Sequence, residues 1–409
     1  MQCLPLLPLA AALFTSGVAA AQPSPPESSS PSELERELDA VLESKQAPSQ
    51  TVKSSSPAGS GLLNPDISVI ADMAAGALSR PPLLQSGDDP SFDGPLGRKT
   101  GGLTLQELEV GFQSTVDPYF SANAFLTIPN LEGIEVEEAY ATTTSLPGGL
   151  QLKAGVFRSS AGRQNEQHLH VQDFSRRPLL NAAYLGTDGL RPPGLQLSWL
   201  VPLPFFLRIA GEVLSVAPGS SATFGGALRS SPAFLVSAKA FRPFSESWSL
   251  LFGVTGAAGH APSPSQGDQP LTANGPRSLL GGLDLYLKYL PPNHVQHYFS
   301  LALQAELFAR RVSAFEGEPV FADAGFYAQL VAQLARRWHA GVRYDLVGAA
   351  ASELQPKVER VTAMAVLTPS EFSRVRLQGS RASSPDTDGS WEALLLLEYS
   401  IGAHGAHPF

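Results

Sequence analysis

The sequence is poor in several features that soluble and cofactor-binding proteins usually contain. Its single cysteine excludes a disulfide-stapled scaffold and any zinc or iron–sulfur site built from cysteines. Charged residues make up only 16% of the 409 residues, below the roughly 25% of ordinary soluble domains. The net charge of −9 lacks the basic excess that binding to phosphate backbones needs, so no nucleic-acid partner is expected. We also expect no cofactor.

Long apolar runs are missing after the N-terminus. Beyond residue 21, no stretch reaches the roughly 18 apolar residues that a membrane-spanning helix requires. The most apolar segment, 195–216, is broken by Pro202 and Pro204 and is typical of two strands around a tight turn. The sequence therefore predicts no transmembrane helix.

The N-terminus predicts export. Residues 4–14 are apolar, and the small residues that end at Ala21 form a cleavage pattern, so we expect residues 1–21 to be a signal peptide. No Lys or Arg precedes the apolar stretch. A membrane anchor is the rival interpretation, but the stretch is too short to span a bilayer. A lipid anchor on Cys3 is disfavoured because Cys3 precedes the apolar stretch.

Residues 22–61 are predicted to form a disordered or periplasmic linker. They are rich in Pro, Ser, Gln and Glu, as disordered segments are. Within them, residues 32–45 predict a short helix, because Leu34, Leu38 and Leu42 recur at four-residue spacing. This helix is either a solvated element or a tether for oligomerisation or for the peptidoglycan side.

Residues 62–409 alternate between apolar and polar side chains, which is the period of a β-strand. In residues 299–307, for example, Leu301, Leu303 and Leu307 share one face and Gln304 and Glu306 the other. Many segments run to about ten residues or more, as tilted membrane strands require, whereas globular strands are nearer five or six. The predicted strands are 62–78, 103–116, 118–128, 134–144, 150–158, 194–201, 205–216, 232–242, 246–258, 278–290, 296–309, 322–334, 337–349, 357–368, 372–383 and 389–403.

The connections between these strands alternate between short and long. Short ones include 117–118, 202–204 and 336–337, and long ones include 79–102 and 159–193. Outer-membrane barrels have short periplasmic turns and longer external loops, whereas a soluble sandwich has no reason to sort its loops in this way. The sequence therefore predicts an all-β fold, a transmembrane antiparallel up-and-down barrel of about sixteen strands (14–18).

Aromatic residues stand beside the predicted turns, as in the interfacial girdles of membrane barrels. Examples are Tyr119, Trp248, Trp338 and Trp391, and the chain ends in Phe409. The soluble alternatives are a secreted β-sandwich and a β-solenoid, but no fixed repeat favours a solenoid.

The inward faces of the predicted strands carry charges of both signs. A charge on the lipid face costs roughly 2–4 kcal/mol at the membrane midplane, so these groups are expected to face the lumen. They indicate a wet interior, as about sixteen strands allow, or they brace the wall as ion pairs. The candidates are Glu107, Glu109, Lys153, Arg208, Glu212, Lys239, Asp284, Lys288, Glu306, Arg343, Asp345, Arg374, Arg376, Glu392 and Glu398.

The long external loop 159–193 is the candidate constriction because of its dense polar side chains. Its arginines could bind an anion through their fork geometry. The pair His168 and His170 could hold a metal ion together with Glu166 or Asp173. The third interpretation is a loop that is folded on itself by hydrogen bonds. The pore candidates are Arg158, Arg163, Asn165, Glu166, His168, His170, Asp173, Arg176 and Arg177.

Short stretches carry a family resemblance. Residues 64–68, residues 150–157 and the run from Gly162 to His170 with Arg177-Pro178 resemble porin-like outer-membrane proteins. These are the phosphate-selective-porin-like barrels and related small proteins labelled zinc-regulated TonB-dependent outer-membrane receptors. The resemblance implies a barrel that transports solutes or ions, phosphate and zinc among them. The linker is too short for the plug domain of a true TonB-dependent receptor.

We therefore expect a non-enzymatic outer-membrane channel of a Gram-negative bacterium for passive or substrate-biased passage of small solutes or ions. One alternative is a zinc-linked uptake receptor without a plug, and a second is a closed structural barrel. A barrel-embedded hydrolase is not expected, because Ser159, Ser160, His168 and Asp173 show no recognised triad spacing. The expected partners are outer-membrane lipid, a small solute or ion, and two further copies in a homotrimer.

Overall fold

The structure is a computed structural model, and it describes most of residues 65–402. The gaps in this range are residues 88, 94–96, 226–231, 263–274, 314–319, 350–355 and 386. The predicted signal peptide, the linker with its helix at 32–45, and Phe409 lie outside the described residues.

Long strands dominate the described residues. They are β1 (Asp66–Leu78), β2 (Gly97–Arg98), β3 (Gly101–Thr115), β4 (Phe120–Pro129), β5 (Glu135–Thr143), β6 (Leu150–Val156), β7 (Pro193–Leu200), β8 (Phe206–Leu214), β9 (Ala233–Pro243), β10 (Trp248–His260), β11 (Arg277–Tyr289), β12 (Ser300–Val312), β13 (Phe321–Ala335), β14 (Trp338–Ala349), β15 (Val358–Ser370), β16 (Ser373–Ser384) and β17 (Thr387–Gly402).

Helical elements are short. They are η1 (Pro147–Gly149), η2 (Gln164–Glu166), η3 (Leu169–Val171), η4 (Asn181–Leu185) and α2 (His294–His297). Among the described residues, no helix is long and apolar enough to cross a membrane.

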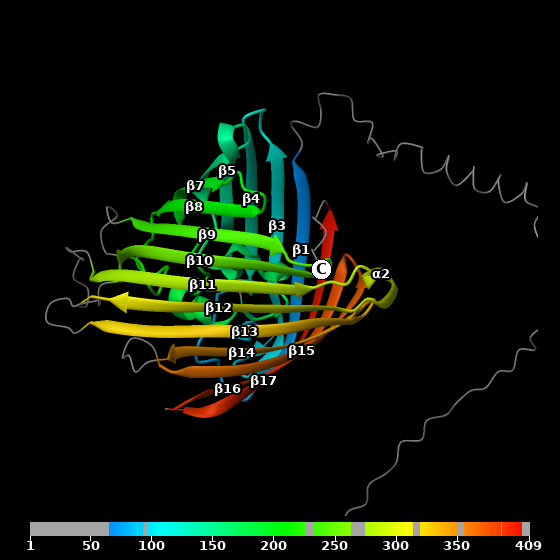
Figure 1. Ribbon diagram of the computed structural model, residues 1–409. Helices are drawn as coiled ribbons and strands as arrows, with labels where there is room; N and C mark the ends of the chain where they lie inside the picture. The colour runs from blue at the N-terminus through cyan, green and yellow to red at the C-terminus, as the bar shows by residue number, and fades with distance from the viewer. Residues whose placement is uncertain are drawn as a thin grey trace, which may run out of the picture. The chain divides into compact units, whose positions relative to one another are not determined.

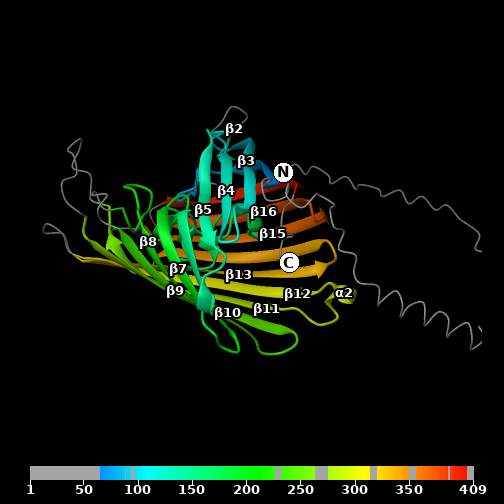
Figure 2. The ribbon, with the colours of Figure 1, turned by 90° about the horizontal axis from the view of Figure 1, so that it is seen from above.

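The strands form a closed antiparallel barrel of sixteen strands, which confirms the predicted fold class. Each long strand pairs with its neighbours in the chain, and β1 pairs with both β3 and β17, which closes the ring. Figure 1 shows blue β1 beside red β17, and Figure 2 shows the wall curving from β16 through β13 to β9 and β7. The two-residue β2 pairs only with the first two residues of β3 and does not span the wall. Among the strands that the structure describes, closure pairs every long strand on both sides, which a barrel in lipid requires.

The outer face of the wall is apolar. On β17, Leu395 and Leu397 point outward and remain 51% and 46% exposed, while Leu394 and Leu396, which alternate with them, are buried inside. The aromatic residues Trp338 and Phe372, which flank short turns, are also exposed. An apolar belt with aromatic ends is the surface that lipid covers in membrane barrels.

Most predicted strand starts lie within two residues of the observed ones, but the start predicted at residue 296 lies four residues too early. The strand predicted at 296–309 begins at Ser300, because residues 294–297 form α2 and Tyr298 adopts a left-handed conformation with φ 54°. Pro291 and Pro292 precede this turn, and proline donates no ladder hydrogen bond, so strand pairing stops before them.

Candidate functional site

The lumen is occupied by the loop between β6 and β7. Most of residues 157–191 are buried, including Phe157, Leu180, Tyr184 and Leu185, which are almost completely inaccessible. Their apolar side chains pack against lumen-facing Phe308 in the main buried cluster. The predicted long loop therefore lies inside the barrel and is not folded on itself outside it.

A buried loop without regular secondary structure must find partners for its backbone amides and carbonyls. Carboxylates of the wall accept hydrogen bonds from loop N–H groups. The bonds run from Arg158 to Glu138 at 2.6 Å, from Ser160 to Glu212 at 2.8 Å, from Gln164 to Glu306 at 2.6 Å and from Leu179 to Asp345 at 3.0 Å.

Cations of the wall complement these carboxylates by donating to loop carbonyl oxygens. The bonds run from Lys239 to Gly162 at 2.6 Å, from Arg374 to His170 at 2.5 Å, from Arg376 to Gln172 at 3.1 Å and from Arg360 to Arg177 at 2.7 Å. Most charges predicted to face the lumen thus do so, and several of them hold the main chain of the loop.

Asn165 joins the two ends of the loop. Its side-chain amide donates to the carbonyl oxygens of Ser159 at 2.9 Å and Leu190 at 3.0 Å, and its Oδ1 accepts from the Leu190 N–H at 2.9 Å. Gly189 has a φ of 73°, and a Cβ there would lie 2.4 Å from Asn165 Oδ1. Asn165, predicted to line the pore, is fully buried in the neck of the loop.

Glu166 and Asp173 occupy different electrostatic environments. Glu166 pairs with Arg208 at 2.5 Å and with Lys239, and these cations outweigh burial and lower the pKa of Glu166. Burial raises the pKa of Asp173, which the arginines Arg374 and Arg376 only partly oppose. Glu166 therefore links the loop to β8 and β9 as an ionised group.

Arginines gather where the loop meets β14–β17. Arg343 and Arg360 share the carboxylate of Asp345, at 3.0 and 3.3 Å. Arg176 binds Glu392 at 2.6 Å, and Arg374 binds Glu398. Among the described residues, buried Arg343 Nη1 and Arg376 Nε donate no hydrogen bond. We call Arg176, Arg343, Arg360, Arg374 and Arg376 the arginine band.

A hollow flanks the arginine band on each side. The first is lined by Asp173, Lys288, Arg374 and the β15 residues Met364 and Val366. The second lies towards the other end of β15, and its lining includes Arg176, Val358 and Arg360. The band therefore separates two spaces along the same stretch of wall.

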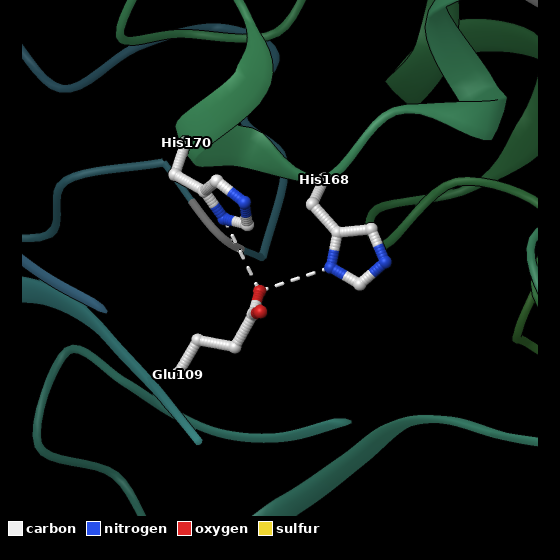
Figure 3. A group of neighbouring side chains, drawn as sticks. All are labelled: Glu109, His168 and His170. Carbon is white, nitrogen blue, oxygen red and sulfur yellow. Dashed lines mark hydrogen bonds and ion pairs between the residues drawn. The ribbon is translucent and has the colours of Figure 1, made fainter. Parts of the chain in front are cut away.

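Glutamates and histidines meet on the β3–β5 side of the lumen, and Figure 3 shows Glu109 facing His168 and His170. The Nδ1 atoms of His168 and His170 lie 2.9 and 3.3 Å from Glu109 Oε2, and His168 Nε2 lies 2.7 Å from Glu138 Oε2. Burial lowers the pKa of His168, but Glu137 and Glu109 outweigh it and raise this pKa well above its ordinary value. His168 and His170, predicted as a metal-binding pair, therefore share a carboxylate.

The remaining predicted site residues lie along the lumen with individual contacts. The Arg163 guanidinium lies 4.2 Å from the centre of the Tyr286 ring, and Lys153 Nζ lies 4.4 Å from the centre of the Tyr140 ring. Glu107 is buried on β3, Asp284 is buried on β11 beside Gly253, and Arg177 is buried in the loop.

Sequence reasoning missed Glu137, Glu138, Arg360 and Asp89. Alternation along β15 would have found Arg360, which lies two residues from the inward-facing Val358 and Thr362. Glu137 and Glu138 are consecutive yet both buried, because a register shift in β4–β5 pairing places a bulge there. No local pattern marks Asp89, whose Oδ2 lies 3.2 Å from Arg176.

No family model matches the chain. A protein of Aquifex aeolicus (strain VF5) is 33% identical over 382 residues, which cover 84% of this chain and 80% of that protein. The chain belongs to the family of this Aquifex protein.

Solved porins share the fold. The anion-selective porin of Comamonas acidovorans gives a TM-score of 0.54 at 9% identity, covering 83% of this chain and 99% of that chain. The outer-membrane channel DcaP of Acinetobacter baumannii gives 0.55 at 10% identity, covering 82% and 97%. Pseudomonas putida OprB gives 0.51 at 10% identity, covering 83% and 94%. At this identity the likeness shows a porin-like barrel fold, and none of these names refers to phosphate or zinc.

Proposed function

We propose that this chain is an outer-membrane channel for small solutes, and that residues 157–192 form its constriction. The observation that carries the proposal is a polar lumen inside an apolar wall, narrowed by a loop that the wall holds from several sides. A sixteen-stranded barrel is wide enough for an aqueous channel, and a folded loop in the lumen sets the size of what passes. The anion-selective porin and DcaP, which share this fold, are named as a porin and an outer-membrane channel.

The arginine band favours small anions. The five arginines pair with four acids, Asp89, Asp345, Glu392 and Glu398, and Arg376 donates to a backbone carbonyl, so the band carries one more positive charge than the acids that pair with it. The guanidinium group binds carboxylate and phosphate through parallel N–H groups, and rings of such groups select anions. We place the proposed route of the solute along β15, where a hollow lies on either side of the band. Phosphate is one anion that this chemistry fits.

A reversal potential tests this selectivity. The full chain is refolded into a planar bilayer under a tenfold KCl gradient, where we expect a potential of the sign that chloride permeation produces. Arg376→Gln removes a charge from the band and should shift the potential towards zero. Arg311→Gln is the matched control, because Arg311 is exposed on the outer side of β12. A cation-selective potential, or no current from a folded barrel, would overturn the proposal, and the second result would indicate a closed structural barrel.

We further propose a homotrimer in which copies meet over β5–β8. These strands have 9, 7, 8 and 9 residues, whereas β10–β17 have at least 12. A strand needs about 9–11 residues to cross the hydrocarbon core, so β6 and β7 are too short and β5 and β8 only just suffice, and this side of the wall suits contact with protein. Leu152 and Leu197 are exposed there. Sedimentation in detergent should give three times the chain mass, and a monomer mass would exclude the trimer.

A further inference from the structure

Three potential metal ligands converge where the loop touches β3. Glu109 comes from β3, and His168 and His170 come from the start of η3 and from η3 itself (Figure 3). One ligand atom from each residue lies within 4.8 Å of those of the other two. We propose that Glu109, His168 and His170 bind a divalent transition-metal ion of the Zn²⁺ type.

The distances suit such an ion. Zinc binds histidine nitrogen and carboxylate oxygen at about 2.0–2.1 Å in tetrahedral sites, which places neighbouring ligand atoms about 3.3 Å apart. The Nδ1 atoms of His168 and His170 lie 2.9 and 3.3 Å from Glu109 Oε2. An ion can therefore take the place of the protons between these groups once the two histidine nitrogens, which lie within 4.8 Å of each other, have moved to the spacing of neighbouring ligands. Two histidines and one carboxylate are also a ligand set that zinc uses in proteins, with a further position left for water or a fourth ligand.

The surrounding groups orient the ligands as outer-shell partners do. A metal-bound histidine usually donates its other N–H to a carboxylate, and His168 Nε2 lies 2.7 Å from Glu138 Oε2. Arg158 holds Oε1 of Glu137, through Nε at 3.0 Å. Glu137 Oε2 is left 3.2 Å from His168 Nδ1 and, within the described residues, accepts no hydrogen bond. This oxygen is the fourth ligand, or the acceptor for a metal-bound water.

The local charge favours a divalent cation. Glu107 and Glu109 are buried on β3, Glu137 and Glu138 are buried on β5, and β4 pairs with both strands. Buried carboxylates require compensating charge. Arg158 and His168 supply positive charge beside them, which is less than the charge of the four carboxylates. A small cavity adjoins the cluster and provides an approach for an ion; its charged lining residues are Glu107, Glu135, Glu137, Asp188, Arg158 and Arg191. A bound ion would fasten the loop to β3, and this binding is separate from conduction.

Zinc titration of the full chain tests the site. The barrel is purified in detergent, treated with EDTA, dialysed and titrated with ZnCl₂ in a calorimeter. We expect one ion per chain, at least tenfold weaker binding in His170→Gln and Glu109→Gln, and roughly 10–100-fold weaker binding in Glu138→Gln. His294→Gln is the matched control, because His294 lies in the turn after β11, where it contacts Gln333 and not the cluster. Heat-modifiable migration on gels reports that each variant is folded.

A spectroscopic measurement keeps the proposal testable if a variant fails to fold. Co²⁺ added to the wild-type chain should give the strong visible absorption of a four-coordinate ion, and Zn²⁺ should abolish it. The proposal would be overturned by a folded wild-type barrel that binds no Zn²⁺, because the cluster is then held by protons alone. It would equally be overturned by binding that is unchanged in the folded His170→Gln variant. Neither result depends on whether the barrel conducts.

Discussion

Asn165→Ala should release the neck of the loop. The substitution removes three hydrogen bonds at 2.9–3.0 Å. The Leu190 N–H and the carbonyl oxygens of Ser159 and Leu190, all buried, then lose their bonds to the Asn165 side chain. A buried polar group that is left unsatisfied costs about 1–3 kcal/mol. The Leu190 carbonyl oxygen keeps one partner, because the Ser159 N–H still donates to it at 2.8 Å, so this group adds less to the cost. We therefore expect loop docking to weaken by about 2–4 kcal/mol, which raises the open population about 30- to 700-fold.

Trypsin measures that population. Arg176 is buried in the docked loop, and cleavage after it requires opening, so the cleavage rate follows the open fraction when closing is fast. The rate should rise by the same factor in Asn165→Ala, while the barrel itself stays folded. Asn293→Ala, in an exposed turn, should cleave like the wild type. Equal rates in Asn165→Ala and the wild type would refute the inference that the neck holds the loop.

Three further predictions follow from single contacts. Arg208 and Lys239 lower the pKa of Glu166 below 4.5, so the ion pairs of Glu166 stabilise the docked loop fully above pH 4.5 and are lost as the pH falls through the lowered pKa. Conductance should therefore rise on acidification, and it should rise less in Glu166→Gln. Gly162→Ala should speed tryptic cleavage, because φ is 70° and a Cβ would lie 2.2 Å from Glu306 Oε2; an unchanged rate would contradict that geometry. Leu395→Arg should destabilise the barrel by about 2–4 kcal/mol in urea unfolding from vesicles if Leu395 faces lipid, and a neutral effect would count against the assigned outer face.

The barrel could be predicted from the sequence because its signal is local. Leu395 and Leu397 on one face of β17 and Glu392 and Glu398 on the other follow from the two-residue period, whatever the strand pairs with. The alternation of short and long connections then predicted that consecutive strands pair antiparallel. The boundaries differed most before Ser300, where a helical turn follows two prolines.

The docking of the loop could not be predicted, because its partners are distant in sequence. Ser160 binds Glu212, which is 52 residues away, and Gln164 binds Glu306, which is 142 residues away. From the sequence alone, each glutamate is predicted only to face the lumen, and its partner in the loop is not predicted. The sequence likewise singled out His168 and His170 but could not supply Glu109 as their shared partner, since only strand register brings β3 under the loop.

The bulge in β5 is the reason why Glu137 and Glu138 could not be predicted as part of this cluster. A strict two-residue period places either Glu137 or Glu138 on the outer face, whereas the register shift after Phe125 turns both inward. Bulges depend on the fit between neighbouring strands, so a single strand's pattern does not reveal them.

Single-channel conductance with and without the loop tests the central claim most directly. The full chain is compared in planar bilayers with a variant in which residues 159–191 are replaced by a short Gly-Ser linker between β6 and β7. We predict small, steady openings for the wild type and a several-fold larger conductance for the shortened barrel, because the loop narrows a lumen that is otherwise open. Equal conductance in the two would contradict a constriction built from this loop, and a silent wild type beside a conducting variant would contradict a channel.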